Sequence, residues 1–231
     1  DPLWSRGLGD VYKRQDLGYE VSQQEQLNLA LMKAVGAIFI AGETGSGKST
    51  TLVTMMTLDP ARRSYKSYSI EDPVEYRIYG VSQMPVRRDI TLAEDAAPFA
   101  EAMRVLMRSD PDTVMVGEIR DKETADVFAP AVQSGHRVLT TVHAASAIGI
   151  IDRLSSAPIL MPRAVLAGKR FISALVYQSL LPTLCPHCRI SAAKAMPASR
   201  LHLMESKFQV DVSGVCIVNE AGCSQCHAGR S

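Results

Sequence analysis

The sequence contains no run of apolar residues long enough to cross a bilayer. Its longest apolar region, residues 30–41, is interrupted by Lys33 and is shorter than the roughly 20 residues that a membrane-spanning helix needs. The pattern of a secretory signal peptide is also missing. Both absences argue against an exported or membrane-spanning chain, and we expect a protein that is located in the cytosol.

An excess of charge of either sign is missing as well. The 25 lysines and arginines nearly balance the 24 aspartates and glutamates, which leaves a formal net charge of +1. Proteins that bind nucleic acid through its phosphates usually carry a basic excess, so we expect no nucleic-acid partner. Apolar residues are plentiful, because 46% of the 231 positions are hydrophobic. This amount suits one good-sized α/β domain with a small appendage.

The first fifteen residues show neither helical nor strand periodicity, and Trp4 looks exposed. They resemble a translated junction rather than part of a native chain. The sequence also lacks an initiating Met and stops abruptly at Ser231, so we interpret it as a fragment. We predict a non-native leader at residues 1–15, an α/β domain at 16–180, and a cysteine-containing module at 181–231 that is truncated at its C-terminus.

The most informative stretch, residues 42–50, follows a short apolar run at residues 37–41. Its spacing fits G-x-x-x-x-G-K-[ST], the phosphate-binding loop that joins a strand to a helix. Glycines let backbone N–H groups turn toward a phosphate, Lys48 supplies a point charge, and Ser49 offers a hydroxyl to Mg²⁺. A plain glycine-rich turn would not explain these residues. The predicted nucleotide-binding residues are Gly42, Glu43, Thr44, Gly45, Ser46, Gly47, Lys48, Ser49 and Thr50.

An acidic segment from Glu71 to Glu75 follows a predicted strand at residues 67–70. Pro73 cannot extend a central strand, so these carboxylates are expected on a loop. In an open parallel sheet, ligands bind at the carboxyl ends of the strands, and the acids would face the same crevice as Lys48. The alternative is a solvated acidic turn.

A second acid follows the predicted strand at residues 113–116, which ends in Gly117 and Glu118. A buried strand that ends in an acid is what a P-loop ATPase uses to hold the water shell of its metal ion. The usual acid is Asp, so Glu118 departs from the pattern.

Two histidines, His136 and His143, bracket a predicted strand at residues 137–142. His143 would lie at the carboxyl end of this strand, beside the crevice. A single histidine is more often a structural residue than a catalyst, and this alternative stays open.

The remaining chain is predicted to be helical. A loop followed by a helix closed by Gly36 is expected at residues 16–34, and further helices are expected at 48–58, 91–109 and 121–133. Residues 147–179 have helical apolar spacing that is interrupted at Pro158 and Pro162. The helix at 91–109 has Thr91 as its N-cap and Glu94 at the capping-box position. Arg104 and Arg108 lie one turn apart on it and can project toward one neighbour, although arginines on a helix surface are usually just solvated.

The tail contains two C-x-x-C pairs, formed by Cys185 with Cys188 and by Cys223 with Cys226. Paired thiolates indicate a structural, tetrahedral Zn²⁺ site, and disulfides are disfavoured in a cytosolic chain. His187, His227 and Cys216 could each replace one ligand, but two complete pairs need no further ligand.

The order of these motifs resembles that of the secretion ATPases of type II secretion and type IV pilus assembly. The similarity covers residues 36–229 and includes the phosphate-binding loop, both acidic segments, the two histidines and the two cysteine pairs. It implies a RecA-like P-loop core, with a mostly parallel sheet flanked by helices, that hydrolyses ATP with Mg²⁺.

The resemblance also implies roles for individual residues. Glu71 opens the acidic segment beside the nucleotide, Glu75 would position the attacking water, and Glu118 would be the acid near Mg²⁺, together with Ser49. His136 and His143 match the histidine motif of the family, in which His143 would sense the γ-phosphate. Arg104 and Arg108 would bear on phosphate charge, either in cis or at a subunit interface.

Members of the family form hexameric rings in which a preceding domain contributes arginines to the nucleotide site. That domain is absent from the sequence, so the resemblance implies that this chain binds nucleotide but hydrolyses it poorly or not at all by itself. The implied whole is a motor at the cytoplasmic face of the inner membrane, bound through an inner-membrane platform and recruiting proteins. Retraction motors generally lack the cysteine pairs, which favours an assembly or secretion motor.

Two other functions stay open. A P-loop ring translocase could act on DNA, although the near-neutral charge argues against it. A nucleotide-gated scaffold without ATP turnover would use the same loop for binding alone.

Overall fold

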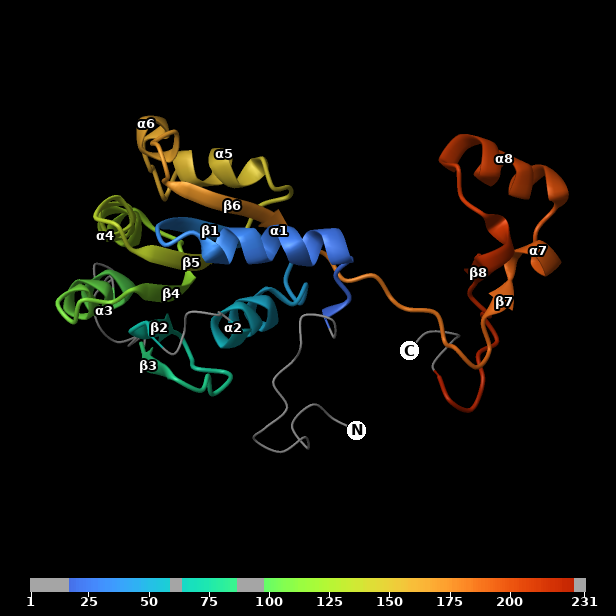
Figure 1. The fold of residues 1–231 in the computed structure, drawn as a ribbon, viewed down its shortest axis with the longest axis horizontal. Helices are drawn as coiled ribbons and strands as arrows, with labels where there is room; N and C mark the ends of the chain where they lie inside the picture. Colours follow the sequence, from blue (N-terminus) through green and yellow to red (C-terminus); the bar gives the residue numbers. More distant parts are fainter. Residues whose placement is uncertain (1–16, 59–63, 87–97, 227–231) are drawn as a thin grey trace. The chain divides into compact units, whose positions relative to one another are not determined.

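The structure is a computed structural model that describes residues 17–58, 64–86 and 98–226. The chain divides between Ser179 and Leu180 into two compact units. The first contains a six-stranded sheet with helices and the second a two-stranded sheet with helices (Figure 1). The proposed leader, the predicted N-cap Thr91 with Glu94, and His227 lie outside the described residues.

The sheet of the first unit has the strand order β3-β2-β4-β5-β1-β6, and every pairing between neighbours is parallel. Its strands are β1 (Gly36–Ala41), β2 (Ser67–Glu71), β3 (Val81–Pro85), β4 (Thr113–Glu118), β5 (Arg137–Val142) and β6 (Ile172–Tyr177). Because the strands run in one direction, all six end at the same edge of the sheet. We call this edge the carboxyl edge and the opposite one the amino edge.

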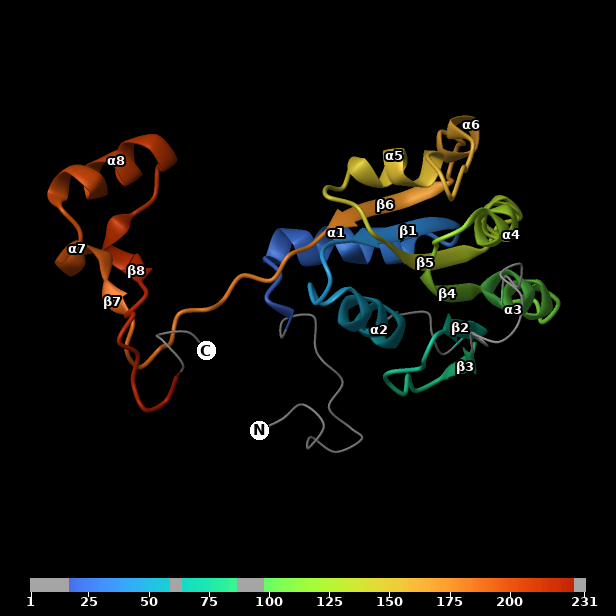
Figure 2. The ribbon, with the colours of Figure 1, turned by 180° about the vertical axis from the view of Figure 1, so that it is seen from behind.

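Helices cover both faces of this sheet (Figures 1 and 2). They are α1 (Val21–Met32), α2 (Lys48–Leu58), α3 (Pro98–Met107), α4 (Lys122–Gln133), α5 (Gly149–Ser155) and α6 (Arg163–Leu166). The strand β1 is buried on both sides, because Ile38 and Ile40 pack with α1 and α2 while Phe39 packs with the helices of the other face. This alternation follows from the twofold side-chain period of a strand.

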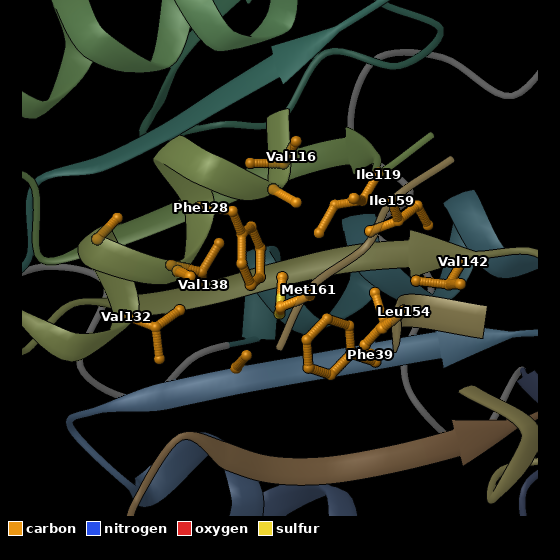
Figure 3. Packing of buried hydrophobic residues seen from close by; sticks show 14 of the residues in the cluster. Phe39, Val116, Ile119, Phe128, Val132, Val138, Val142, Leu154, Ile159 and Met161 are labelled. Carbon is orange, nitrogen blue, oxygen red and sulfur yellow. The ribbon is translucent and has the colours of Figure 1, made fainter. Parts of the chain in front are cut away.

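The larger core cluster lies between the sheet and the helices α3, α4 and α5 (Figure 3). The rings of Phe39 in β1 and Phe128 in α4 have centroids 5.6 Å apart, and both side chains are fully buried. The helix α4 begins where Asp121 caps it, because the Asp121 carboxylate accepts a hydrogen bond of 2.7 Å from the Thr124 N–H. The contact between the two rings therefore joins β1 to α4, the helix that follows β4.

Several predicted elements agree with the structure. The helix at residues 48–58 and the strand at 137–142 have the predicted bounds, and the strands predicted at 37–41, 67–70 and 113–116 are each extended by one or two residues. These are the most buried segments, in which the apolar pattern is strongest.

Two strands of the six-stranded sheet were not predicted. Residues 172–177, predicted as helical, form the edge strand β6, which pairs with β1. The strand β3 follows β2 after a short loop at residues 72–80, with no helix between them. Both are outermost strands of the sheet and are only partly buried, so their apolar pattern is weak. Gly36 is likewise the first residue of β1 rather than the end of α1, which stops at Met32.

The second unit is small and has little apolar core. Its elements are β7 (Ile190–Ser191), α7 (Ala192–Ala195), α8 (Ala198–Phe208), the 3₁₀-helix η3 (Val212–Gly214) and β8 (Cys216–Ile217). Among the described residues 180–226, only Cys185 and Ala192 are buried. A unit of this size usually needs a disulfide or a metal ion to hold its fold.

Candidate nucleotide site and cysteine cluster

The loop at residues 42–47 joins the carboxyl end of β1 to the first residue of α2, Lys48. A Cβ atom on Gly42 would lie 2.2 Å from the Gln178 carbonyl oxygen and 2.5 Å from Ser46 Oγ, so only glycine fits at this position. Gly45 and Gly47 have φ angles of +78° and +82°, which side chains rarely adopt. The glycines predicted from the motif are therefore required by the shape of the loop.

The polar side chains of Lys48 and Ser46 differ in their hydrogen bonding within this loop. The Lys48 ammonium donates to the carbonyls of Gly42 and Glu43, at 2.9 Å and 2.8 Å, and so lies across its own loop. Burial lowers the pKa of Lys48, and the nearby Glu118 carboxylate partly opposes this effect. Ser46 Oγ is buried without a hydrogen-bond partner among the described residues. A lysine held over a glycine loop at a helix N-terminus fits a nucleotide phosphate.

Glu118 lies at the end of β4 between two basic groups. Arg120 Nη2 is 2.5 Å from its Oε2 atom, and His143 Nε2 is 3.4 Å from its Oε1 atom. The hydrogen bond to Glu118 raises the pKa of Arg120. The register between β4 and β5 shifts at Gly117, and the Thr141 hydroxyl donates to the Gly117 carbonyl at 2.6 Å. The bulge brings Glu118 to the carboxyl edge that also holds Lys48.

This arrangement suits Mg²⁺. The Glu118 side chain is 15% exposed, so it is accessible but partly desolvated, and Ser49 is exposed in the first turn of α2. Mg²⁺ keeps most of its waters and takes one or two protein oxygens, which a hydroxyl and a carboxylate supply. These two residues are the ones that would hold the ion beside a bound nucleotide.

The acidic segment divides into a buried and an exposed part. Glu71 is buried, and its Oε1 atom accepts hydrogen bonds from the Ser69 hydroxyl at 2.5 Å and from the Gln83 amide at 2.9 Å. Glu71 therefore ties β2 to β3 at the rim of the site. Glu75 is exposed on the loop at residues 72–80, where its carboxylate is accessible to solvent.

Three predicted residues are not brought to this edge. His136 precedes β5 at the amino edge, where its Nδ1 atom lies 2.9 Å from the Ala131 carbonyl oxygen and 3.0 Å from Ser134 Oγ. The full length of β5 therefore separates His136 from His143. Arg104 is exposed on α3, and Arg108 is exposed just beyond the end of that helix. Roles for these residues at the nucleotide site stay predictions.

A group of polar side chains beneath the loop was not predicted. It consists of Tyr19, Thr51 and Gln178, which are linked by hydrogen bonds of 2.8 Å from the two hydroxyls to Gln178 Oε1. These residues lie up to 159 positions apart in the sequence, and no motif connects them. Gln178 follows the missed strand β6, so its position could not be derived from the sequence pattern.

The second unit brings Cys185, Cys188, Cys223 and Cys226 together, with all four sulfur atoms within 4.8 Å of one another. The separations are 3.9 Å between Cys185 and Cys223, 3.6 Å between Cys188 and Cys226, and 3.7 Å between Cys223 and Cys226. A tetrahedral Zn²⁺ with Zn–S bonds of about 2.3 Å places its sulfurs roughly 3.8 Å apart. The cluster therefore has the size of a four-thiolate metal site.

The thiols and their neighbours fit this interpretation. Desolvation, together with hydrogen bonds to Cys226, Cys223 and Cys185, raises the pKa of the Cys188 thiol to about 12. Uptake of a metal ion would therefore displace protons from the cluster. Of the alternative ligands, Cys216 and His187 are not part of the group that the described residues form.

The fold and the residues at the carboxyl edge are those of the RecA-like core of P-loop nucleoside triphosphatases. The glycine loop follows β1, the acid follows β4, and β5 lies between these two strands. The family model described as "Type II/IV secretion system protein" matches residues 9–231, and the chain belongs to this family.

Relatives and solved structures agree with this assignment. The chain is 36% identical over 215 residues to the type II secretion system protein E of Klebsiella pneumoniae, and 35% identical over 214 residues to the type IV pilus assembly ATPase PilB of Pseudomonas aeruginosa. These alignments cover 91% and 92% of this chain but 39% and 35% of the relatives. The chain thus spans about two fifths or less of the length of the relatives it matches.

Among solved structures, the pilus retraction motor PilT with bound ADP is 30% identical, with a TM-score of 0.56 over 87% of this chain and 58% of that one. The DotB ATPase of Legionella pneumophila is 27% identical, with a TM-score of 0.54 over 74% of this chain and 47% of that one. These similarities support a secretion or pilus ATPase and not the DNA-translocase alternative. Among the described residues, no helix combines the length and apolar character needed to span a bilayer.

Proposed function

We propose that the chain is the ATP-binding motor domain of a machine that assembles a pilus or a secretion pseudopilus. The observation that carries this proposal is the placement of the loop lysine, Lys48, after β1 and of the acid Glu118 at the end of β4, both at the carboxyl edge of the sheet. ATP supplies the phosphoanhydride bond whose cleavage drives the motor, and Mg²⁺ neutralises phosphate charge. The protein binds and orients both.

In this proposal each residue at the carboxyl edge has one task. Backbone N–H groups of the loop and Lys48 bind the β- and γ-phosphates, while Ser49 and Glu118 hold the ion. Glu75 orients the attacking water, because an exposed carboxylate is too weak a base at neutral pH to take the proton early. His143 contacts Glu118 and is 50% exposed, which leaves it accessible to a γ-phosphate.

Assembly into a homo-hexamer would complete the site. Arg104 and Arg108 are exposed on and just after α3, and His136 lies at the amino edge, so in this proposal the three residues act on nucleotide across an interface. The motor would be located at the cytoplasmic face of the inner membrane, bound to a platform protein and recruiting proteins. The cysteine pairs favour a role in assembly or secretion over retraction.

The test is the concentration dependence of ATP turnover together with ADP affinity. We expect ADP to bind to the isolated chain with Mg²⁺, and turnover to be very low in dilute solution and to rise with protein concentration or with the full-length protein. Robust turnover that is independent of concentration would contradict the need for assembly. Binding without turnover even in the full-length hexamer would favour a nucleotide-gated scaffold.

The cysteine cluster is proposed to hold one structural Zn²⁺. Elemental analysis should find one zinc per chain, and Cys188→Ser should lose it. Because the second unit has little apolar core, chelation should abolish the hydrogen-exchange protection of residues 180–226 while leaving β1 and β5 protected. Cys216→Ser is the matched control and should keep the metal. A metal-free chain with a fully protected second unit would exclude the site.

A further inference from the structure

The side chain of Gln178 connects the nucleotide loop by hydrogen bonds to other parts of the first unit. Its Nε2 atom donates to the Ser46 carbonyl, in the middle of the loop. Its Oε1 atom accepts from Thr51 Oγ1 in α2 and from Tyr19 OH, each at 2.8 Å. The Ser46 carbonyl can only accept, so the NH₂ group of the amide faces it, and Oε1 faces the two hydroxyls, which also lie 3.1 Å from each other.

The backbone of Gln178 holds the other end of the same loop. Its N–H donates to the Ala41 carbonyl at 2.9 Å, which continues the pairing of β6 with β1. Its carbonyl oxygen lies so close to Gly42 that a Cβ there would be 2.2 Å away. One residue thus contacts the last residue of β1, the first residue of the loop and the carbonyl of Ser46.

Tyr19 extends this connection toward the segment that precedes α1. Its backbone carbonyl accepts from Gln24 Nε2 at 2.8 Å, which joins Tyr19 to the first turns of the helix. Burial raises the pKa of the Tyr19 hydroxyl, and the hydrogen bond with Thr51 partly opposes this. The phenol therefore stays protonated and can donate at neutral pH.

We infer that Gln178 is a positioning residue that couples occupancy of the nucleotide loop to the order of residues 17–24. It does not touch the nucleotide. It fixes the Ser46 carbonyl, so that the neighbouring backbone N–H groups keep the geometry that a phosphate requires. A bound nucleotide reduces the mobility of the loop and thereby that of the Gln178 amide. The hydrogen bonds to Oε1 then restrain Tyr19 and Thr51. This inference rests on the proposed role of residues 42–50 in nucleotide binding.

Two substitutions distinguish the contribution of the Gln178 NH₂ group from that of its carbonyl oxygen. Gln178→Leu removes every side-chain hydrogen bond, whereas Gln178→Glu keeps an acceptor for Tyr19 and Thr51 but places a carboxylate oxygen against the Ser46 carbonyl. Both should weaken ADP binding to the full chain about 5-fold to 10-fold, the usual effect of one or two lost hydrogen bonds. Ser173→Ala is the matched control, because Ser173 Oγ donates to the Val35 carbonyl at 3.0 Å at the other end of β6. Its ADP affinity should stay within twofold of wild type.

The coupling to Tyr19 is tested by a double-mutant cycle and by hydrogen exchange. Tyr19→Phe should weaken ADP binding about 2-fold to 3-fold in the wild-type background and have no effect in Gln178→Leu. ADP should increase the protection of residues 17–24 in wild type and in Ser173→Ala, and this increase should be lost in Gln178→Leu and reduced in Tyr19→Phe. A merely structural Gln178 would lower the unfolding temperature without these changes.

The possible results distinguish failure of the nucleotide site from failure of the positioning role of Gln178. If wild type does not bind ADP, the proposed nucleotide site itself fails. If wild type binds ADP and both Gln178 variants bind it equally well, or if the effects of Tyr19→Phe and Gln178→Leu simply add, the positioning role is wrong while the nucleotide site stands. If Gln178→Leu does not fold, Gln178→Glu and Tyr19→Phe still decide the question.

Discussion

The two edges of the sheet both carry polar side chains, but they use them differently. At the amino edge, Arg137 is almost completely buried, and its guanidinium donates to Thr113 Oγ1 and to the Leu31 carbonyl and lies 5.3 Å from the ring centroid of Tyr65. At the carboxyl edge, Lys48 contacts only its own loop carbonyls among the described residues, apart from its interaction with Glu118. At the amino edge, other parts of the fold therefore supply the hydrogen-bond partners of Arg137, whereas at the carboxyl edge Lys48 bonds to carbonyls of its own loop.

This difference separates residues that serve stability from residues that serve binding. Buried polar groups are normally satisfied, so a satisfied one needs no ligand to explain it. Ser46 Oγ, which is buried without a partner in the described part of the chain, lies at the carboxyl edge. We therefore expect substitutions at the amino edge to change the free energy of unfolding, and substitutions at the carboxyl edge to change nucleotide affinity.

The largest expected effect is that of Arg137→Ala. The change leaves the Leu31 carbonyl and Thr113 Oγ1 without their buried donor and removes a large packed side chain. The free energy of unfolding should fall by about 3 kcal/mol. Urea denaturation measures this, and ADP affinity of the folded variant should stay within twofold of wild type. An ADP affinity that falls with stability would show that the two edges are not independent.

Lys48→Ala tests the opposite edge. Removing the charge should weaken ADP binding about 30-fold, because hydrogen bonds to charged groups contribute about 1.5–3 kcal/mol. The free energy of unfolding should change by less than about 0.5 kcal/mol, since the lost bonds are partly exposed. Lys33→Ala is the control, because Lys33 Nζ also donates to a backbone carbonyl, that of Ser173, at 3.1 Å. Calorimetric titration should find that Lys33→Ala binds ADP normally.

Glu118→Gln should affect only the contribution of the metal ion. With Mg²⁺ the variant should bind nucleotide about 10-fold more weakly than wild type, while with EDTA the two should be equal, because the amide keeps the shape but loses the charge that attracts the ion. Glu123→Gln, an exposed change on α4, should behave as wild type in both conditions. An equal loss with and without Mg²⁺ would place Glu118 outside the metal site.

The two histidines should give effects no larger than that of Glu118→Gln. His136→Ala should lower the free energy of unfolding by about 1 kcal/mol, because it removes the contact between Nδ1 and the Ala131 carbonyl. His143→Ala should leave stability unchanged and should reduce ATP turnover by the full-length assembly about 10-fold. Denaturation and turnover of both variants, compared side by side, check this. If His136→Ala instead reduced ATP turnover and left stability unchanged, His136 would act at the nucleotide site.

The sequence was informative where a motif or strong burial fixes the structure. The loop residues, Glu118 and the four cysteines could be identified because their spacing reflects one local geometry. The edge strands β3 and β6 were missed, since their partly exposed residues carry no clear period. Gln178 could not be found, because its function depends on Tyr19, Thr51 and Ser46, which only the tertiary fold brings to it.

For His136, the sequence motif and the fold give different kinds of information. The strand between the two histidines was predicted with the correct bounds, and the two ends of a strand lie at opposite edges of a parallel sheet. That geometry alone places His136 and His143 on opposite edges within one chain. The family motif groups them in sequence, whereas the fold separates them.

The contrast between the two units has a consequence for how such chains change in evolution. The first unit completes both of its core clusters with residues up to Val176. In the second unit few apolar side chains are buried among the described residues, and the proposed metal ion bound by four thiols would supply stability instead. Because the described residues of both core clusters end at or before Val176, substitutions in the segment after Ser179 could accumulate in evolution without altering the apolar core of the first unit.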